Sequence, residues 1–217
     1  LPCSVEEAVL VAERVREAIH AGQTDLGENK VQEGLKKAEE LSGEAIRWSM
    51  IGHLQSNKVK DVLRFADEVQ SLDRLSLAAA LEKRLQSLGR SLDVLVQVNT
   101  SNEASKYGLA PDDVPAFLKE LTAFDALRPH GFMTLARFTP DQAEVLRCFR
   151  VLRQIRDHAL DDAPQGNALR HLSMGMSGDY ETAIEEGATI VRVGQAVFGP
   201  RPLPDSYYWP DATSRTG

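Results

Sequence analysis

The residues best suited to ligand chemistry lie in two short segments near the end of the sequence, 172–179 and 191–199. The first, Leu-Ser-Met-Gly-Met-Ser-Gly-Asp, contains small residues that let backbone approach a ligand closely. Ser177 precedes a helical pattern, so we expect it to cap that helix. The N–H groups at a helix start also favour an anion. A capped helix without any ligand is the simpler alternative.

The second segment places an arginine inside an apolar run. Arg192 lies between Val191 and Val193, and alternation along a strand puts it on the face opposite its neighbours. A buried guanidinium needs a partner, which is either a carboxylate of the protein or an acceptor on a ligand. Gly194 then begins a turn with free N–H groups, and 195–198 can form a short helix. Together the two segments predict a phosphate site.

The elements that must position these residues alternate between short apolar runs and longer amphipathic stretches. The runs that predict strands are 24–26, 47–51, 68–72, 92–98, 130–134, 169–173 and 189–193, with a candidate eighth at 9–12. Apolar residues repeat at helical spacing in 31–41, 75–88, 114–124 and 145–155. This alternation is typical of βαβ units and a parallel sheet.

Eight such units predict a (β/α)₈ barrel of the TIM type, and the alternative is an open, doubly wound sheet. In a barrel, phosphate often binds at the loops after the seventh and eighth strands, where both segments fall. We expect one domain over residues 1–217, with 200–217 as a proline-rich tail.

Composition excludes several function classes. The net charge of −7 argues against a nucleic-acid binder, and no apolar run approaches the length of a membrane span. The acidic start is unlike a secretory leader. Cys3 and Cys148 are expected to be unpaired thiols in a reducing, cytoplasmic compartment. The five histidines lack metal-ligand spacing, so no metal site is expected.

Five motifs, in order, give the chain a resemblance to a known family. They are Gly-Glu-Asn-Lys-Val-Gln-Glu at 27–33, Ile-Gly-His-Leu-Gln-Ser-Asn-Lys at 51–58, Glu-Ala-Ser-Lys-Tyr-Gly at 103–108, Gly-Phe-Met-Thr-Leu at 131–135, and the segments within 172–199. The chain resembles the pyridoxal 5′-phosphate (PLP) homeostasis proteins. The resemblance implies a barrel like the N-terminal domain of alanine racemase, with PLP bound in it.

The resemblance also assigns cofactor-binding residues by position: Arg192, Ser177, Gly194, Gln195, Asn29, Met174 and Ser173. It implies that Ser177, Gly194 and the backbone of Gln195 hold the phosphate and that Arg192 faces the pyridine nitrogen. An arginine there keeps this nitrogen unprotonated and weakens the ring as an electron sink. Asn29, Met174 and Ser173 are implied to line the pocket; turn polarity and core filling are their alternative roles.

One family feature is absent. The family's first strand ends in a Ser-Lys or Thr-Lys motif whose lysine forms the Schiff base with PLP. Here Leu10-Val11-Ala12 resembles the start of that strand, yet Glu13 already opens a helical pattern. Either the printed sequence omits a segment between Leu10 and Glu13, or the protein has no such lysine. Lys30, Lys58 and Lys106 are expected to be surface charges.

The resemblance implies a protein that binds, buffers and delivers PLP without catalytic turnover. Its expected partners are PLP and PLP-dependent apoenzymes, and we expect a cytoplasmic monomer. One alternative is an amino-acid racemase, although only 18 residues follow Gly199, too few for a second domain. The other is a barrel that binds a different phosphorylated ligand.

Overall fold

The computed structural model describes residues 5–162 and 169–199 of the 217-residue chain. The predicted tail at 200–217 and Cys3 lie outside these residues. The elements are α1 (Val5–His20), β1 (Asp25–Glu28), α2 (Val31–Glu40), β2 (Arg47–Met50), η1 (Ser56–Lys58), α3 (Val59–Val62), β3 (Glu68–Leu72), α4 (Leu75–Leu88), β4 (Leu92–Gln97), η2 (Pro111–Asp113), α5 (Val114–Leu121), β5 (Leu127–Met133), α6 (Gln142–Asp162), β6 (His171–Met176), α7 (Tyr180–Glu185), β7 (Ile190–Arg192) and α8 (Gln195–Phe198).

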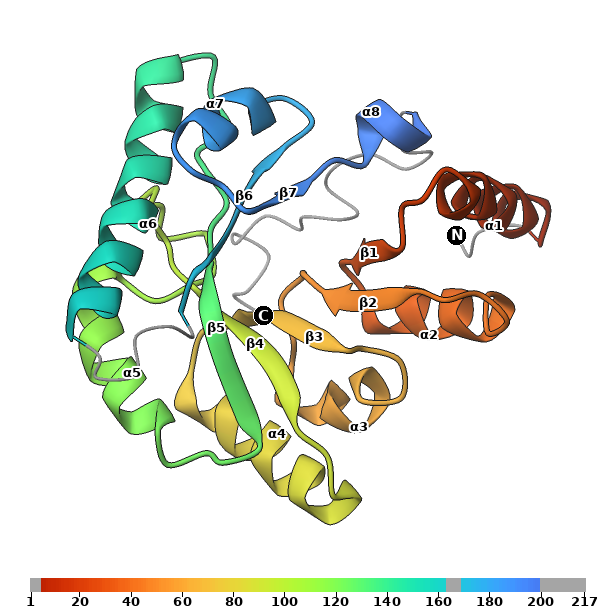
Figure 1. Cartoon of the computed structure of the whole chain (residues 1–217), viewed down its shortest axis with the longest axis horizontal. Helices are drawn as coiled ribbons and strands as arrows, with labels where there is room; N and C mark the ends of the chain where they lie inside the picture. The colour runs from red at the N-terminus through yellow and green to blue at the C-terminus, as the bar shows by residue number, and fades with distance from the viewer. Residues whose placement is uncertain (1–4, 163–168, 200–217) are drawn as a thin grey trace, which may run out of the picture.

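The strands form one curved parallel sheet in sequential order, β1-β2-β3-β4-β5-β6-β7. Each strand pairs in parallel with the next one in sequence, and the helices lie outside the curve (Figure 1). A doubly wound sheet would reverse its strand order in the middle. The order found here is that of a barrel, which confirms the predicted architecture.

The predicted strand at 9–12 is wrong. These residues belong to α1, which runs without interruption from Val5 to His20. A run of four apolar residues does not by itself distinguish a helix from a strand. The spacing of Ala8, Ala12, Val15 and Ile19 at three or four residues is that of a helix. The described sheet therefore has seven strands instead of eight, and it is open between β1 and β7 (Figure 1).

Side-chain alternation separates an apolar layer from a polar interior. Outward side chains such as Val94, Phe132 and Leu172 are fully buried and belong to one core with Phe149 of α6. On β3, Glu68 and Gln70 share a face, because residues two apart on a strand point the same way. They are 1% and 3% exposed, so the barrel interior is closed to solvent at this level and carries charge.

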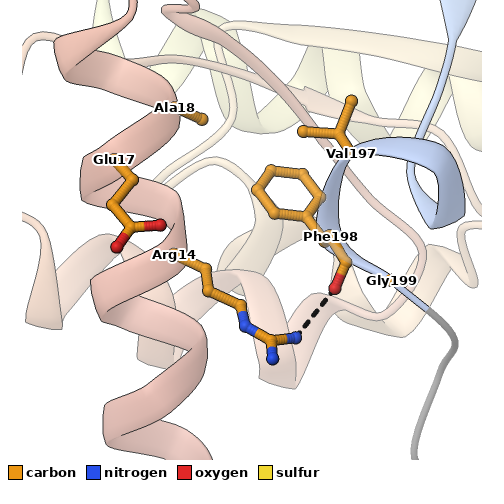
Figure 2. A pocket seen from close by; sticks show the side chains of 6 residues that line it. All are labelled: Arg14, Glu17, Ala18, Val197, Phe198 and Gly199. Atoms are coloured by element: carbon orange, nitrogen blue, oxygen red, sulfur yellow. Dashed lines mark hydrogen bonds between the residues drawn. The ribbon is translucent and has the colours of Figure 1, made fainter.

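The open side of the sheet is bridged by two helices. Nη1 of Arg14 in α1 donates a 2.8 Å hydrogen bond to the carbonyl of Phe198 in α8, and Figure 2 shows this contact. A cavity of about 530 Å³ lies between these helices, lined by Arg14, Glu17, Ala18, Val197, Phe198 and Gly199. Within the described residues, no helix has the length and apolar character needed to cross a membrane.

Candidate functional site

Arg192 ends β7 and points into the barrel interior. Its Nη1 donates to Oγ of Ser173 at 2.6 Å, and its Nη2 donates to the carbonyl of Thr134 at 2.7 Å. Burial lowers the pKa of the guanidinium to about 10, against an opposing effect of Asp179, so the group stays charged at neutral pH. No ion pair joins Arg192 to a carboxylate of the described residues. Its partners there are neutral.

Ser173 connects Arg192 to the opposite wall of the barrel. Its hydroxyl donates to Oε1 of Gln70 on β3 at 2.6 Å, and the side chain is fully buried. Gln70 in turn donates from Nε2 to Oε2 of Glu68 at 2.6 Å. The structure thus joins Ser173 and Arg192, which the resemblance assigned separately to the pocket, by a direct hydrogen bond.

Glu68 collects several donors at the other end of this chain of contacts. Ser49 Oγ donates to its Oε2 at 2.7 Å, and His130 Nε2 lies 2.8 Å from its Oε1. Burial alone would raise the pKa of this carboxyl. The hydrogen bonds of His130, Gln70 and Ser49, with the charge of Arg47, lower it to about 2. Glu68 is therefore ionised at neutral pH.

The two loops of the predicted phosphate site meet in the structure. The N–H of Ala196, in the first turn of α8, lies 3.4 Å from Oγ of Ser177. Gly194 is the N-cap of α8, and its carbonyl accepts hydrogen bonds from Val197 and Phe198. The predicted helix at 195–198 is present, so Ser177, Gly194 and Gln195 lie together beyond the ends of β6 and β7.

Ser177 does not cap α7, contrary to the sequence prediction. The helix begins at Tyr180, and its N-cap is Asp179, whose Oδ1 accepts a 2.6 Å hydrogen bond from the N–H of Met176. β6 continues to Met176 instead of ending at Ser173, and the helix N-cap lies two residues further along the chain than predicted, at Asp179. Ser177 is thereby left in the loop, with its hydroxyl directed to α8 instead of α7.

Asn29 and Met174 differ in their surroundings. Asn29 follows β1, and its Oδ1 is buried with no hydrogen-bond partner among the described residues. That acceptor is consistent with a position beside a ligand. Met174 is fully buried and belongs to the hydrophobic core between the sheet and the helices. Its side chain lies opposite to that of Ser173, so it fills the core instead of lining the interior as predicted.

Three interior residues were missed by sequence reasoning: Gln70, Glu68 and Thr134. The available signal was the alternation of polar residues in Glu-Val-Gln-Ser-Leu, because a strand covered by helices on its outer side must direct its polar face into the barrel.

Lys106, expected to be a surface charge, is instead held by Glu103 at 2.7 Å and the carbonyl of Ala136 at 2.8 Å. No candidate metal cluster occurs within residues 5–162 and 169–199.

Comparison with known proteins agrees with this geometry. Residues 8–202 match the family model described as the N-terminal domain of alanine racemase. The chain is 43% identical over 190 residues to the pyridoxal phosphate homeostasis protein of Pseudomonas aeruginosa, covering 88% of this chain and 80% of that protein. It is 40% identical over 189 residues to the protein of the same name from Aquifex aeolicus, covering 87% and 82%.

Solved structures give the same result. PipY of Synechococcus elongatus PCC7942, with PLP bound, has a TM-score of 0.80 at 36% identity and 87% coverage of each chain. An alanine racemase of Clostridium difficile 630 has a TM-score of 0.74 at 15% identity and covers 92% of this chain and 51% of its own, a likeness of fold alone. The fold and site define a barrel of the alanine racemase N-terminal class. Within that class, the chain belongs to the family of pyridoxal phosphate homeostasis proteins.

Proposed function

We propose that this protein binds PLP, buffers this reactive aldehyde and delivers it to PLP-dependent apoenzymes, with no catalytic turnover of its own. The observation that carries the proposal is the half-buried Arg192, whose described partners are a hydroxyl and a carbonyl. A positive charge with neutral partners suits an acceptor on a ligand. The names of the relatives, and the PLP bound to PipY, support the choice of ligand.

The donor set fits the two ends of PLP. Ser177, Gly194 and the N–H of Gln195 would bind the phosphate, and Arg192 would donate to the pyridine nitrogen. Bound PLP supplies an aldehyde and an electron-accepting ring. A donor that remains protonated at neutral pH leaves the ring nitrogen as an acceptor without a proton. This weakens the ring as an electron sink and favours storage over carbanion chemistry. Asn29 and Ser173 would contribute polar atoms to the same pocket.

The site of action follows from the cofactor. Apoenzymes that need PLP are the recipients, and we place this exchange in the cytoplasm, with the protein acting as a monomeric single-domain barrel. Delivery needs a site that binds PLP and also releases it. Hydrogen bonds from Ser177 and Arg192 meet both requirements, since each contributes only about 1–3 kcal/mol to binding.

The proposal is tested by titrating the protein with PLP and following its absorbance and circular dichroism. We expect saturable binding by the native chain and a weaker or spectrally altered complex in Arg192→Ala. The matched control is Arg128→Ala, which removes a more exposed arginine from the start of β5. No saturable binding by the native chain would overturn the proposal, and an unchanged Arg192→Ala spectrum would remove Arg192 from the site.

Borohydride reduction followed by peptide mapping locates the lysine that the family uses. A pyridoxyl adduct in a peptide outside the printed sequence would place the Schiff base in a further segment of the protein. Saturable binding with no specific adduct would mean that PLP is held by the residues named above without a covalent bond. Racemisation of free alanine at enzyme-like turnover would contradict the non-catalytic role. Equal binding of unrelated phosphate esters would favour another phosphorylated ligand.

A further inference from the structure

A continuous line of hydrogen bonds crosses the barrel interior and ends at Arg192. The three contacts run from Arg192 to Ser173, from Ser173 to Gln70 and from Gln70 to Glu68, and each is 2.6 Å long. Ser173 and Gln70 are 103 positions apart in sequence, on β6 and β3. The line therefore joins opposite walls of the barrel, with the charge of Arg192 at one end and that of Glu68 at the other.

The chemistry of the groups fixes the direction of every bond. Ionised Glu68 can only accept, so the amide of Gln70 must turn its NH₂ group to Glu68 and its oxygen to Ser173. That oxygen accepts a hydrogen bond from the Ser173 hydroxyl, which has only one proton to donate. The remaining lone pairs of Ser173 are then available only as acceptors, which is what the guanidinium of Arg192 requires. The orientation of Ser173 is thus set from Glu68.

Burial stabilises this arrangement of hydrogen bonds. Glu68, Gln70 and Ser173 are 1%, 3% and 0% exposed, so water does not compete for their hydrogen bonds. The far end is anchored by Ser49 and His130, which also contact the carboxylate. Removing the hydrogen-bond partner of a buried polar group costs more free energy than removing the partner of an exposed one, because water cannot replace it. A change at Gln70 is therefore expected to propagate to the guanidinium instead of being repaired by solvent.

We propose that Gln70 and Glu68 are positioning residues that hold Arg192 toward a ligand ring by orienting the hydroxyl of Ser173. The inference rests on the proposed function for the identity of that ring, although the arrangement of Arg192 itself does not depend on PLP. Neither residue lies in the two loops assigned to the phosphate. Their effect should therefore reach the ring end of the ligand and leave the phosphate end unchanged.

The first test compares Gln70→Met, which removes the amide at similar size, with Ser71→Ala. Ser71 is the neighbouring buried residue on β3, and its hydroxyl has no partner among the described residues. Gln70→Met should bind PLP about 3- to 10-fold more weakly, the effect of one lost hydrogen bond, with an altered dichroism of bound PLP. Its affinity for inorganic phosphate, measured by competition, should be unchanged. Equal losses for both ligands would overturn the proposal.

A double-mutant cycle tests whether Gln70 acts through Ser173. In a Ser173→Ala background, Gln70→Met should have no further effect on PLP affinity, because the connection is already broken. Additive losses would mean that Gln70 acts by another route and would overturn the inference. If Gln70→Met does not fold, Glu68→Gln takes its place in the same cycle. The introduced amide keeps the shape of Glu68 and no longer forces the direction of the bonds.

A readout without PLP separates this inference from the proposed function. In ¹⁵N NMR spectra of the ligand-free protein, the Nη1 protons of Arg192 should exchange with water about 10-fold faster in Gln70→Met than in the native chain or Ser71→Ala. That result together with no PLP binding would reject the function and keep the positioning role. Unchanged exchange would reject the positioning role, whatever the PLP titration shows.

Discussion

Nε2 of His130 on β5 lies 2.8 Å from Oε1 of Glu68 on β3, across an intervening strand. The contact joins the buried carboxylate to a half-buried ring at the strand ends remote from the two phosphate loops. It is one of the contacts that keep the pKa of Glu68 at about 2, below its ordinary value of 4.5. The charge of Glu68 therefore contributes to the stability of the fold as well as to the order of the interior.

This lowered pKa predicts a specific loss of stability in acid. The folded state binds the proton less readily than the unfolded chain, so the contribution is complete above pH 4.5 and disappears as the pH falls toward 2. Its full size is about 3 kcal/mol. Denaturant titrations at several pH values in this window measure the free energy of unfolding. Glu68→Gln should start with a lower free energy of unfolding than the native chain and should lose less of it as the pH falls. The control Glu181→Gln, which changes an exposed residue, should lose the same free energy of unfolding with pH as the native chain. If Glu68→Gln also loses as much as the native chain, Glu68 is not the source of the acid sensitivity.

Gly52 is predicted to tolerate no side chain. A Cβ atom on Gly52 would lie 2.1 Å from the carbonyl oxygen of Asn29, so backbone would have to move. Gly52→Ala should lower the free energy of unfolding by about 1–3 kcal/mol, the usual cost of overpacking. The control is Gly43→Ala, where a Cβ atom meets nothing within 4 Å. Equal stability of the two variants, measured by denaturant titration, would show that the Asn29 loop adapts without strain.

Substitutions in the phosphate loops and at Arg192 are expected to change the affinities for PLP and for inorganic phosphate differently. Ser177→Ala should reduce affinity for both PLP and inorganic phosphate by about 3- to 10-fold, because its hydroxyl would donate to the phosphate. Arg192→Ala should reduce affinity for PLP alone. Competition titrations with both ligands distinguish the two. If Ser177→Ala binds phosphate as well as the native chain does, the hydroxyl makes no contact with it.

Cys148 is predicted to be chemically protected. The thiol lies in α6 and is fully buried in the core. In a Cys3→Ser variant, which leaves Cys148 as the single thiol of the sequence, a thiol reagent such as DTNB should react slowly with the folded protein and at once after denaturation. Rapid reaction of the folded protein would mean that α6 opens readily from the sheet.

Much of the fold was predictable because its elements have clear periods. β3 and α4 occur at the predicted bounds, 68–72 and 75–88. The errors arose where a short pattern fits two structures. The four apolar residues at 9–12 fit a strand as well as a helix, and they belong to α1. β6 continues past Ser173 through Gly175, which has a φ of 93° that glycine adopts without steric strain. The following helix therefore starts later than expected.

The site was predictable in its loops but not in its interior. Ser177, Gly194 and Gln195 lie near each other along two adjacent βα turns, so sequence order alone brings them together. The contact of Gln70 with Ser173 depends on the curvature of the sheet, which places β3 opposite β6. No local pattern carries that information. The direction of Met174 away from the interior likewise follows only when the phase of β6 is known.

The sequential strand order with an opening between β1 and β7 has a consequence for folding kinetics. Every pairing in the described sheet joins a strand to its successor, so each requires closure of one βα loop. Among the described residues no pairing joins β1 to β7, so formation of this part of the sheet does not include the entropy of closing that largest loop. Folding rates fall as contacts become more distant in sequence. The sheet can therefore grow one unit at a time, and the contact between Arg14 and Phe198 joins the two helices beside its open ends.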